Sequence, residues 1–253
     1  MSEAQVNELC ANNCMEVSMK KTNKIIAAKE QLMNKWKCSE DIFSGVENVI
    51  IKSEKIFFEM ITFGSNAAIR ADENIYNWCK DKLQNEEAKN IMDGDILFQI
   101  EKKLREFRYA LAGENVRYLY INSQSEVKKP NEFLYKWFEK EDMSKLYENK
   151  GFDNALNYER DVIAYGAYKD GELVALAGAD DYMNNLWQIG IDVLPNYRKS
   201  GLATYLVKEI AEEIEKRGKI AYYTTWSGNI ASTKVALNVG FIPTWISYYA
   251  EHQ

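Results

Sequence analysis

A short segment, Arg198 to Ala203, joins a strand-like run to a long amphipathic helix pattern, and it limits strongly how the second half of the chain can fold. The run before it extends from Trp187 to Leu194, and the helix pattern begins near Gly201. At such a helix start the first backbone N–H groups have no intrahelical partner, and the helix dipole favours anions. Because the segment also combines small residues with an arginine and a lysine, it predicts a binding site for a pyrophosphate group.

Charge and hydropathy exclude several other classes of protein. The net charge is −6 over 253 residues, and the sequence pI is about 5.2. Contacts to nucleic-acid phosphates need a basic face, so we expect no nucleic-acid partner. The chain has no signal-peptide pattern, and no apolar run approaches the ~20 residues of a membrane helix. We therefore expect a cytoplasmic protein with no membrane partner.

The cysteines do not predict a metal site. All of them lie in the first half of the chain, at Cys10, Cys14, Cys38 and Cys79. The first two have a metal-like spacing, but the single histidine is His252, and no second cysteine pair completes a zinc site. We expect reduced thiols and no metal.

Periodicity divides the chain into two predicted domains, an α+β domain over residues 1–115 and a second domain over residues 116–253. In the first, strand-like runs at 48–53 and 55–63 are expected to be neighbours, and Asp72 is expected to cap a helix. In the second, helical patterns precede a hairpin with the turn Lys169-Asp170-Gly171. The further elements expected there are helices at 131–140, 143–157, 202–217 and 230–238, and strands at 161–169, 172–179, 186–193, 220–225 and 241–249.

Three motifs in this second domain resemble one family. Residues 198–203 fit Q/R-x-x-G-x-G/A, the acyl-CoA pyrophosphate loop of the GNAT superfamily of N-acetyltransferases. Residues 189–197 resemble the fourth strand of that family and its V-x-P-x-x-R lead into the loop. Asn229 to Ser232, followed by Gly240-Phe241, resembles the signature N-x-x-A/S…G-F. The likeness is to bacterial GNAT proteins with an extra N-terminal domain.

The resemblance implies an α+β or α/β protein whose C-terminal domain has a mixed, mostly antiparallel central sheet flanked by helices. It also implies acetyl-CoA as co-substrate. The pyrophosphate would bind the loop backbone, and the pantetheine arm would pair with the strand ending at Val193, which splays from the strand at 220–225. The residues implied to contact acetyl-CoA are Val193, Leu194, Arg198, Lys199, Ser200, Gly201, Leu202, Ala203, Thr204, Asn229 and Ser232. Taken singly, each has a structural alternative, such as a helix N-cap for Asn229.

Proton transfer is less well defined by the sequence. Many relatives carry an acidic tyrosine seven residues after the motif asparagine, where this chain has Ala236. Tyr222 and Tyr223 are alternative acids, although tyrosines on strands usually serve packing. Asp192 is a candidate base or, alternatively, a residue that orients a loop. Asp180 and its neighbour Asp181 either recognise a cationic substrate or form a solvated turn.

Two functions are therefore expected. The first is an N-acetyltransferase that passes an acetyl group from acetyl-CoA to a primary amine, of a small molecule or a peptide, by direct attack. The second is a catalytically weak or inactive acyl-CoA-binding sensor or scaffold, since Ala236 cannot donate a proton.

The segment after Phe241 is short for this family. Twelve residues follow Phe241, fewer than the usual seventh strand needs. We therefore expect the acceptor side to be closed by the N-terminal domain or by the partner subunit of a homodimer.

Overall fold

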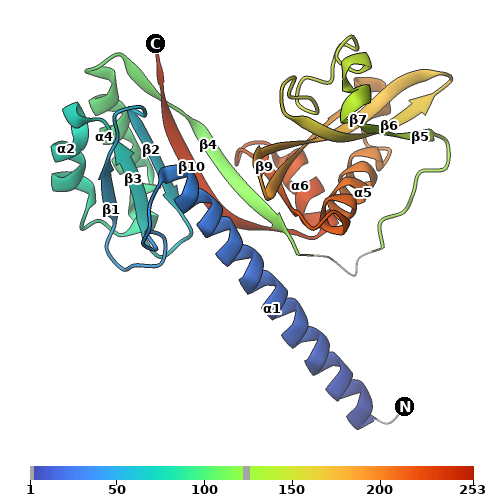
Figure 1. Cartoon of the computed structure of the whole chain (residues 1–253), viewed down its shortest axis with the longest axis horizontal. Helices are drawn as coiled ribbons and strands as arrows, with labels where there is room; N and C mark the ends of the chain where they lie inside the picture. Colours follow the sequence, from blue (N-terminus) through green and yellow to red (C-terminus); the bar gives the residue numbers. More distant parts are fainter. Residues whose placement is uncertain (1–2, 122–125) are drawn as a thin grey trace. The chain divides into compact units, whose positions relative to one another are not determined.

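The computed structural model describes residues 3–121 and 126–253, with only the backbone for residues 3–18 and 20. The described residues form two compact units (Figure 1). The first unit takes its residues from Met1–Leu32, Tyr118–Thr224 and Ile230–Ile242, and the second from Met33–Arg117, Thr225–Asn229 and Pro243–Gln253. The chain order is α1 (Glu3–Trp36), β1 (Val49–Lys52), β2 (Phe58–Thr62), β3 (Ala67–Ala71), α2 (Glu73–Leu83), α3 (Ala88–Ile91), α4 (Gly94–Arg105), β4 (Tyr109–Tyr120), β5 (Leu134–Glu139), η1 (Lys140–Lys145), β6 (Asp161–Lys169), β7 (Glu172–Met183), β8 (Leu186–Val193), η2 (Pro195–Tyr197), α5 (Leu202–Lys216), β9 (Ile220–Thr225), α6 (Ile230–Val239) and β10 (Phe241–His252).

The first unit is built on a mixed sheet with the strand order β4-β9-β8-β7-β6-β5. The pairs β5–β6, β6–β7 and β7–β8 are antiparallel, and β8–β9 is parallel. The expected class, a mostly antiparallel mixed sheet flanked by helices, is confirmed. The described part of the chain does not fall into units cut at residue 115, because α1 and β10 each contribute residues to both units.

Helices and an irregular segment cover opposite faces of this sheet. Helix α5 contacts β6, β7 and β8 and lies next to α6 (Figure 1). The Tyr165 ring of β6 faces α5, where it contacts Tyr205. Its neighbour Ala164 belongs to a separate buried cluster with Phe152 and Ala155. Since successive side chains of a strand point to opposite faces, the segment after η1 covers the face away from α5.

The hairpin of β6 and β7 follows its turn sequence closely. Lys169 and Glu172 are cross-strand partners, so the loop has the two residues Asp170 and Gly171. Both have positive φ, 51° and 87°, as a type I′ turn requires. The turn therefore sets the register of the two strands, and the predicted hairpin is confirmed.

Residues 131–140 were expected to be helical, and that prediction is wrong. The structure has strand β5 here, paired antiparallel with β6 through Tyr135↔Ala167 and Trp137↔Tyr165. The Trp137 ring stacks on Tyr165 with centroids 4.3 Å apart. Aromatic residues gain more from such cross-strand contacts than from a lone helical turn, so tertiary packing outweighs the helical pattern. Residues 143–157 are likewise not a continuous helix but η1 followed by turns.

The second unit has the strand order β1-β3-β2-β10-β4. Strands β1 and β2 were expected to be neighbours, but β3 lies between them, parallel to β1 and antiparallel to β2. The predicted cap of α2 is confirmed, because the Asp72 side chain accepts a hydrogen bond from the Asn74 N–H at 2.9 Å. The apolar core of this unit packs α2 and α4 against the sheet.

None of the helices in the described ranges is long and apolar enough to span a bilayer.

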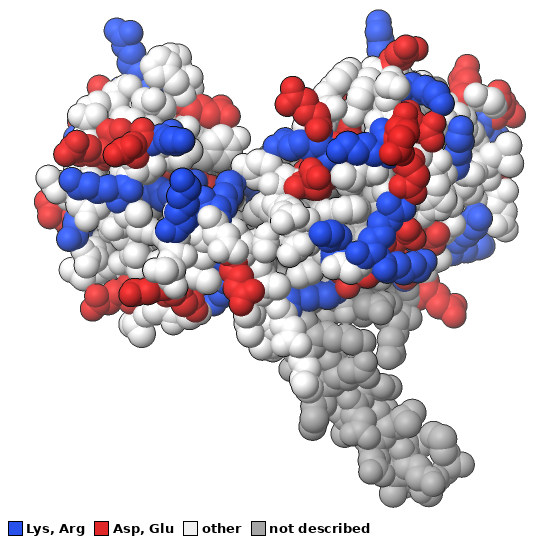
Figure 2. Space-filling view, in the orientation of Figure 1, with Lys and Arg blue, Asp and Glu red and all other residues white. Residues whose placement is uncertain are grey.

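On the face shown in Figure 2, lysine and arginine side chains are interspersed with aspartate and glutamate over both units. Charges of both signs therefore share this face, in keeping with the modest net charge of −6.

Candidate functional site

The loop between β8 and α5 has two residues in the left-handed region, Lys199 with φ of 64° and Gly201 with φ of 85°. A Cβ on Gly201 would meet only Pro130, at 3.8 Å, so this position needs glycine for its backbone conformation rather than for space. The Ser200 hydroxyl donates to the Tyr197 carbonyl at 2.6 Å, and Arg198 Nε donates to the Val193 carbonyl at 3.2 Å. These bonds hold the loop in shape.

The N-terminus of α5 presents backbone N–H groups without a side-chain cap. Gly201 is the N-cap residue and makes no side-chain cap bond. The first helical bond runs from the Tyr205 N–H to the Gly201 carbonyl, at 3.0 Å. The amides of Leu202, Ala203 and Thr204 precede that bond, and the first turn contains no acidic residue. This helix start is therefore suited to an anion.

Strand β8 loses its partner on one side before it ends. In the described part of the chain, its parallel ladder with β9 runs from Leu186↔Ile220 to Ile189↔Tyr223 and stops there. On its other side β8 stays paired with β7 as far as Val193. The stretch Gly190 to Val193 thus keeps one edge without a β9 partner. This divergence is the splay that the sequence predicted at this place.

Asp192 holds the segment that covers this strand. Its carboxylate accepts three hydrogen bonds, from the backbone N–H groups of Asn154 and Ala155 at 2.7 and 2.9 Å and from Asn154 Nδ2 at 2.7 Å. The structure therefore places Asp192 as expected for the loop-orienting alternative. Both oxygens are already engaged by the loop that crosses over β8.

Tyr222 and Tyr223, neighbours on β9, point to opposite faces of the sheet. The Tyr222 hydroxyl donates to Gln188 Oε1 at 2.8 Å. The Tyr223 hydroxyl lies 2.6 Å from the Ser232 hydroxyl on α6. Tyr223 is also the last β9 residue paired with β8, so its ring stands where the two strands part. Burial raises the pKa of the Tyr223 phenol, and the nearby Asp192 charge adds to the increase.

The second sequence signature surrounds the start of α6. Asn229 directly precedes this helix, and its backbone N–H donates to the Trp226 carbonyl at 2.9 Å. Ser232 lies in the first turn and contacts Tyr223. Ala236, one turn further along, is fully buried. Residue 236, where the sequence analysis noted a tyrosine in many relatives, is thus a packing position here, and the phenol that reaches the first turn of α6 belongs to Tyr223.

A family model covers both the loop before α5 and the strands that lead to it. The model described as GNAT acetyltransferase matches residues 52–246, which is most of the chain. The chain belongs to the GNAT acetyltransferase family. The match starts well before residue 116, so the family model also takes in much of the region predicted as an extra N-terminal domain. Such a separate domain is not confirmed.

Solved GNAT structures resemble parts of the chain. A putative acetyltransferase from Novosphingobium aromaticivorans is 17% identical, with a TM-score of 0.45, and covers 56% of this chain and 66% of its own. A GCN5-related N-acetyltransferase-like protein from Streptococcus suis is 13% identical, with a TM-score of 0.46, and covers 63% and 69%. One from Kribbella flavida is 14% identical, with a TM-score of 0.46, and covers 58% and 61%. The chain thus spans two thirds or less of the length of several of these structures, and no curated protein matches it.

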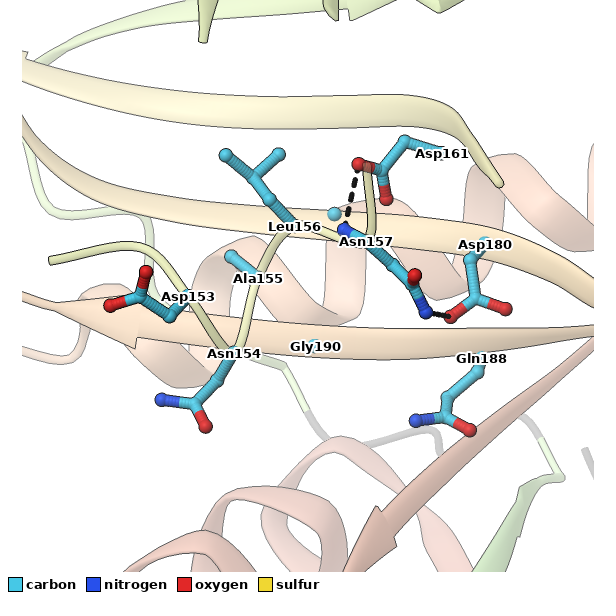
Figure 3. Close-up of a pocket in the computed structure, with 10 residues that line it drawn as sticks. Asp153, Asn154, Ala155, Leu156, Asn157, Asp161, Asp180, Gln188 and Gly190 are labelled. Atoms are coloured by element: carbon cyan, nitrogen blue, oxygen red, sulfur yellow. Dashed lines mark hydrogen bonds between the residues drawn. The ribbon is translucent and has the colours of Figure 1, made fainter. Parts of the chain in front are cut away.

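Beside the splay of this GNAT sheet lies a polar pocket that the sequence did not predict, with a volume of about 200 Å³ (Figure 3). Residues 153–157 form one wall. The sheet forms the other with Asp161, Gly178, Asp180, Gln188 and Gly190. We call this the acidic pocket. The two glycines allow the close approach, because a Cβ on Gly178 would overlap the Ala155 oxygen and one on Gly190 the Asn154 oxygen.

The floor of the acidic pocket includes a row of polar residues on β6, β7 and β8, and Tyr222 of β9 continues this row beyond the pocket. Asp161 pairs with Asp180, Asp180 with Gln188, and Gln188 with Tyr222. Cross-strand partners share a face of the sheet, so the four side chains lie on the same side. Asn157 joins the two carboxylates: its N–H donates to Asp161 at 2.8 Å and its Nδ2 to Asp180 at 3.3 Å (Figure 3).

The two carboxylates are unusual in their burial. Asp161 is 3% exposed and Asp180 is 6% exposed. Burial raises the pKa of both, and for Asp161 the neighbouring charge of Asp180 raises it further. Asp180 is satisfied on both oxygens, since the Tyr182 N–H donates to the second one at 3.0 Å. Asp161 Oδ1, by contrast, is buried without a hydrogen-bond partner.

Sequence reasoning missed Asp161, and it considered Asp180 either as a residue that recognises a cationic substrate or as part of a solvated turn. The signal was present, however, in the two-residue turn at Asp170-Gly171. Counting back from the pair Lys169↔Glu172 points to Asp161 opposite Asp180, although the ladder between them has two register shifts that cancel, which the sequence does not show. The cysteines add nothing to the site: Cys79 is buried, Cys38 is partly exposed, and the side chains of Cys10 and Cys14 lie outside the described residues. Among the described residues no group of three or more His, Cys, Asp or Glu side chains is arranged to hold a metal ion.

Proposed function

We propose that this protein is an acetyl-CoA-dependent N-acetyltransferase that acts on a primary amine by direct attack. The observation that carries the proposal is the continuity between the free edge of β8, at residues 190–193, and the uncapped N-terminus of α5. Acetyl-CoA carries a thioester at one end of a flexible arm and a diphosphate at the other, so its two ends match these two features. The backbone edge offers hydrogen bonds to the amide groups of the arm, and the helix start favours the diphosphate.

Each part of the donor site has a definite task in this proposal. The N–H groups of Leu202, Ala203 and Thr204 bind the diphosphate oxygens, and the exposed Lys199 supplies positive charge. Only the backbone of Leu202 takes part, because its side chain is buried. A β8 N–H beyond Ile189 donates to the thioester oxygen and stabilises the negative charge that develops there.

Tyr223 is the acid of the proposed reaction. After the neutral amine attacks the thioester carbon, the carbon–sulfur bond breaks and the departing thiolate takes the phenolic proton, while the proton that the nitrogen loses passes through solvent water and restores the phenol. Burial raises the pKa of this phenol, so it stays protonated at neutral pH and can donate. Its contact with Ser232 fixes the hydroxyl at the point where β8 and β9 part.

The competing function is an acyl-CoA sensor or scaffold without transfer activity, which Ala236 favours. The two functions share the donor site and differ in chemistry alone. The sensor predicts acetyl-CoA binding with no acetyl transfer to any member of a broad panel of primary amines. The enzyme predicts CoA thiol release that depends on an amine and on Tyr223.

The decisive experiment measures acetyl-CoA binding by calorimetry in wild type, Gly201→Glu and Gly218→Glu. Both glycines have positive φ, 85° and 73°, so the two variants carry a similar backbone strain at opposite ends of the α5 region. Only Gly201→Glu puts a carboxylate at the diphosphate, and we expect at least a hundredfold loss of affinity there. Equal affinities in the two variants, or a folded wild type that binds no acetyl-CoA, would refute the proposal.

A further inference from the structure

A short segment before β5, residues 129–133, packs against the loop that leads into α5, and we call it the strap. A Cβ on Gly201 would lie 3.8 Å from the Pro130 ring. The Phe133 ring meets the Tyr197 ring edge-on, with centroids 6.2 Å apart. The strap therefore lies against both ends of the turn between η2 and the N-cap of α5.

Hydrogen bonds from the sheet hold the strap in place. The Tyr135 hydroxyl donates to the Pro130 carbonyl at 2.7 Å, and Lys169 Nζ donates to the Glu132 carbonyl at 3.2 Å. Lys169 Nζ also lies 5.7 Å from the centroid of the Phe133 ring. Since Tyr135 belongs to β5 and Lys169 to β6, the position of the strap is set by the same sheet that carries the donor loop.

Two aromatic rings orient the ammonium group of Lys129 beside the start of α5. Its Nζ lies 4.9 Å from the centroid of the Tyr135 ring and 5.8 Å from that of the Tyr205 ring. Tyr205 belongs to the first turns of α5, and the next residue in the chain, Pro130, is the one that lies against Gly201. A cation–π contact directs the ammonium but leaves its N–H donors available for a ligand.

The charges around Lys129 leave it available for an anion. Lys129 is exposed, and it forms no ion pair within the part of the chain that the structure describes. It does act on Glu209, whose pKa burial raises, but Lys208 and Lys216 act on this carboxyl as well. Lys129 is therefore not the sole counter-charge of Glu209. Lys199, on the loop that the strap covers, adds a second exposed cation near the same helix start.

We propose that the strap is the second wall of the diphosphate site and that Lys129 Nζ binds a phosphate oxygen of acetyl-CoA. This inference rests on the proposed function, because it adds a residue to the same donor site. The amides at the start of α5 bind the diphosphate from one side, and Lys129 binds it from the side of β5. A charge-assisted hydrogen bond from this ammonium favours a donor that carries phosphates over an acylated arm that lacks them.

The test measures the affinity of the full chain for acetyl-CoA and for S-acetylpantetheine, the arm without phosphates, by calorimetry. We compare wild type, Lys129→Gln, Lys129→Arg and Lys136→Gln. Lys136 is the matched control, because its Nζ lies 4.9 Å from the ring centroid of Phe138, which belongs to the cluster on the face away from α5. We expect roughly fivefold to tenfold weaker acetyl-CoA binding by Lys129→Gln, with most of the affinity retained by Lys129→Arg and all of it by Lys136→Gln.

The phosphate-free arm separates a phosphate contact from a general disturbance of the site. Its affinity should be the same in wild type and Lys129→Gln, and the acetyl-CoA affinity of Lys129→Gln should fall less steeply with added salt than that of wild type. Unchanged acetyl-CoA binding by Lys129→Gln, an equal loss in Lys136→Gln, or an equal weakening of S-acetylpantetheine would each overturn the role of Lys129. A folded wild type that binds no acetyl-CoA would instead refute the proposed function, so the two failures are distinguishable.

Discussion

Gly178 and Gly190 are cross-strand partners in the β7–β8 ladder, and together they let the backbone of residues 154–155 pack directly on the sheet. Cross-strand partners lie side by side on one face, so the two missing side chains leave a single shallow depression. Asp192 then fastens the loop that fills it. The loop wall of the acidic pocket therefore depends on two glycines that face each other on the neighbouring strands β7 and β8.

The first prediction concerns this close packing. Gly190→Ala puts a Cβ onto the Asn154 carbonyl oxygen, and neither is the end of a flexible side chain. We expect a loss of roughly 1–3 kcal/mol in the free energy of unfolding, measured by urea denaturation, because the backbone must move. Gly113→Ala is the matched control, since a Cβ there meets nothing within 4 Å. If Gly190→Ala has the same free energy of unfolding as Gly113→Ala, the packing argument is wrong.

The second prediction separates the two tyrosines. Tyr223→Phe removes the proposed acid, and we expect kcat to fall about 100-fold or more while acetyl-CoA affinity is retained. Tyr222→Phe removes a hydrogen bond to Gln188 on the other face of the sheet, so we expect kcat to change little. Steady-state kinetics with a primary-amine acceptor distinguish the two variants. The reverse assignment of the two effects would exclude Tyr223 as the acid.

The third prediction is a stabilising substitution at Asp161. Burial raises the pKa of this carboxyl in the folded state. The folded protein therefore holds the proton more tightly than the unfolded chain, so the contribution to stability is full at low pH and is lost as pH rises through the folded-state pKa. Above that folded-state pKa the carboxylate is charged and buried. Asp161→Asn should raise the free energy of unfolding there by on the order of 1 kcal/mol.

Urea denaturation from pH 4 to pH 8 checks this sign. The difference between Asp161→Asn and wild type should grow with rising pH, because only wild type acquires the buried charge. The groups that also act on Asp161 are Asp180, Arg160 and the Tyr147 phenol, whose own pKa burial and the Asp161 charge raise to about 12. Asp181→Asn should show little of this pH dependence. A variant at residue 161 that is less stable than wild type at pH 8 would show that the carboxylate is satisfied.

The fourth prediction tests Asp192 as a positioning residue. Asp192→Ala leaves the N–H groups of Asn154 and Ala155 without their acceptor, and we expect a cost of roughly 1–3 kcal/mol. Activity should fall because the loop wall of the pocket moves, yet the pH dependence of kcat/KM should keep its shape. Asp192→Asn, which still offers one oxygen, should recover part of the stability. Loss of the acidic limb of the pH profile would instead identify Asp192 as the base.

Local chemistry accounts for the parts that could be predicted from sequence. The turn Asp170-Gly171, the cap at Asp72 and the positive φ of Gly201 each depend on a few adjacent residues. The same holds for strand β8 and the amphipathic helix α5, whose bounds follow from periodicity. The position of the donor loop, between this strand and this helix, therefore follows from the sequence.

The incorrect predictions concern segments whose secondary structure or strand pairing depends on contacts with residues far away in the sequence. The apolar spacing of residues 131–140 suits a helix, but Trp137 gains a stacking partner only when β6 lies alongside. Strand β3 separates β1 from β2 because pairing order is decided by packing over α2 and α4 and not by proximity in sequence.

The family, the strand–loop–helix arrangement around Gly201 and the two-residue turn of the β6–β7 hairpin follow from the sequence alone. These follow from local backbone preferences, which each short segment carries with it. Three further features could be seen only in the folded chain: Asp192 accepts hydrogen bonds from a loop, Tyr223 reaches Ser232 from β9, and Asp161 and Asp180 are buried together across two register shifts. Those outcomes depend on which surfaces meet after folding, because burial and hydrogen-bond satisfaction are properties of the packed chain.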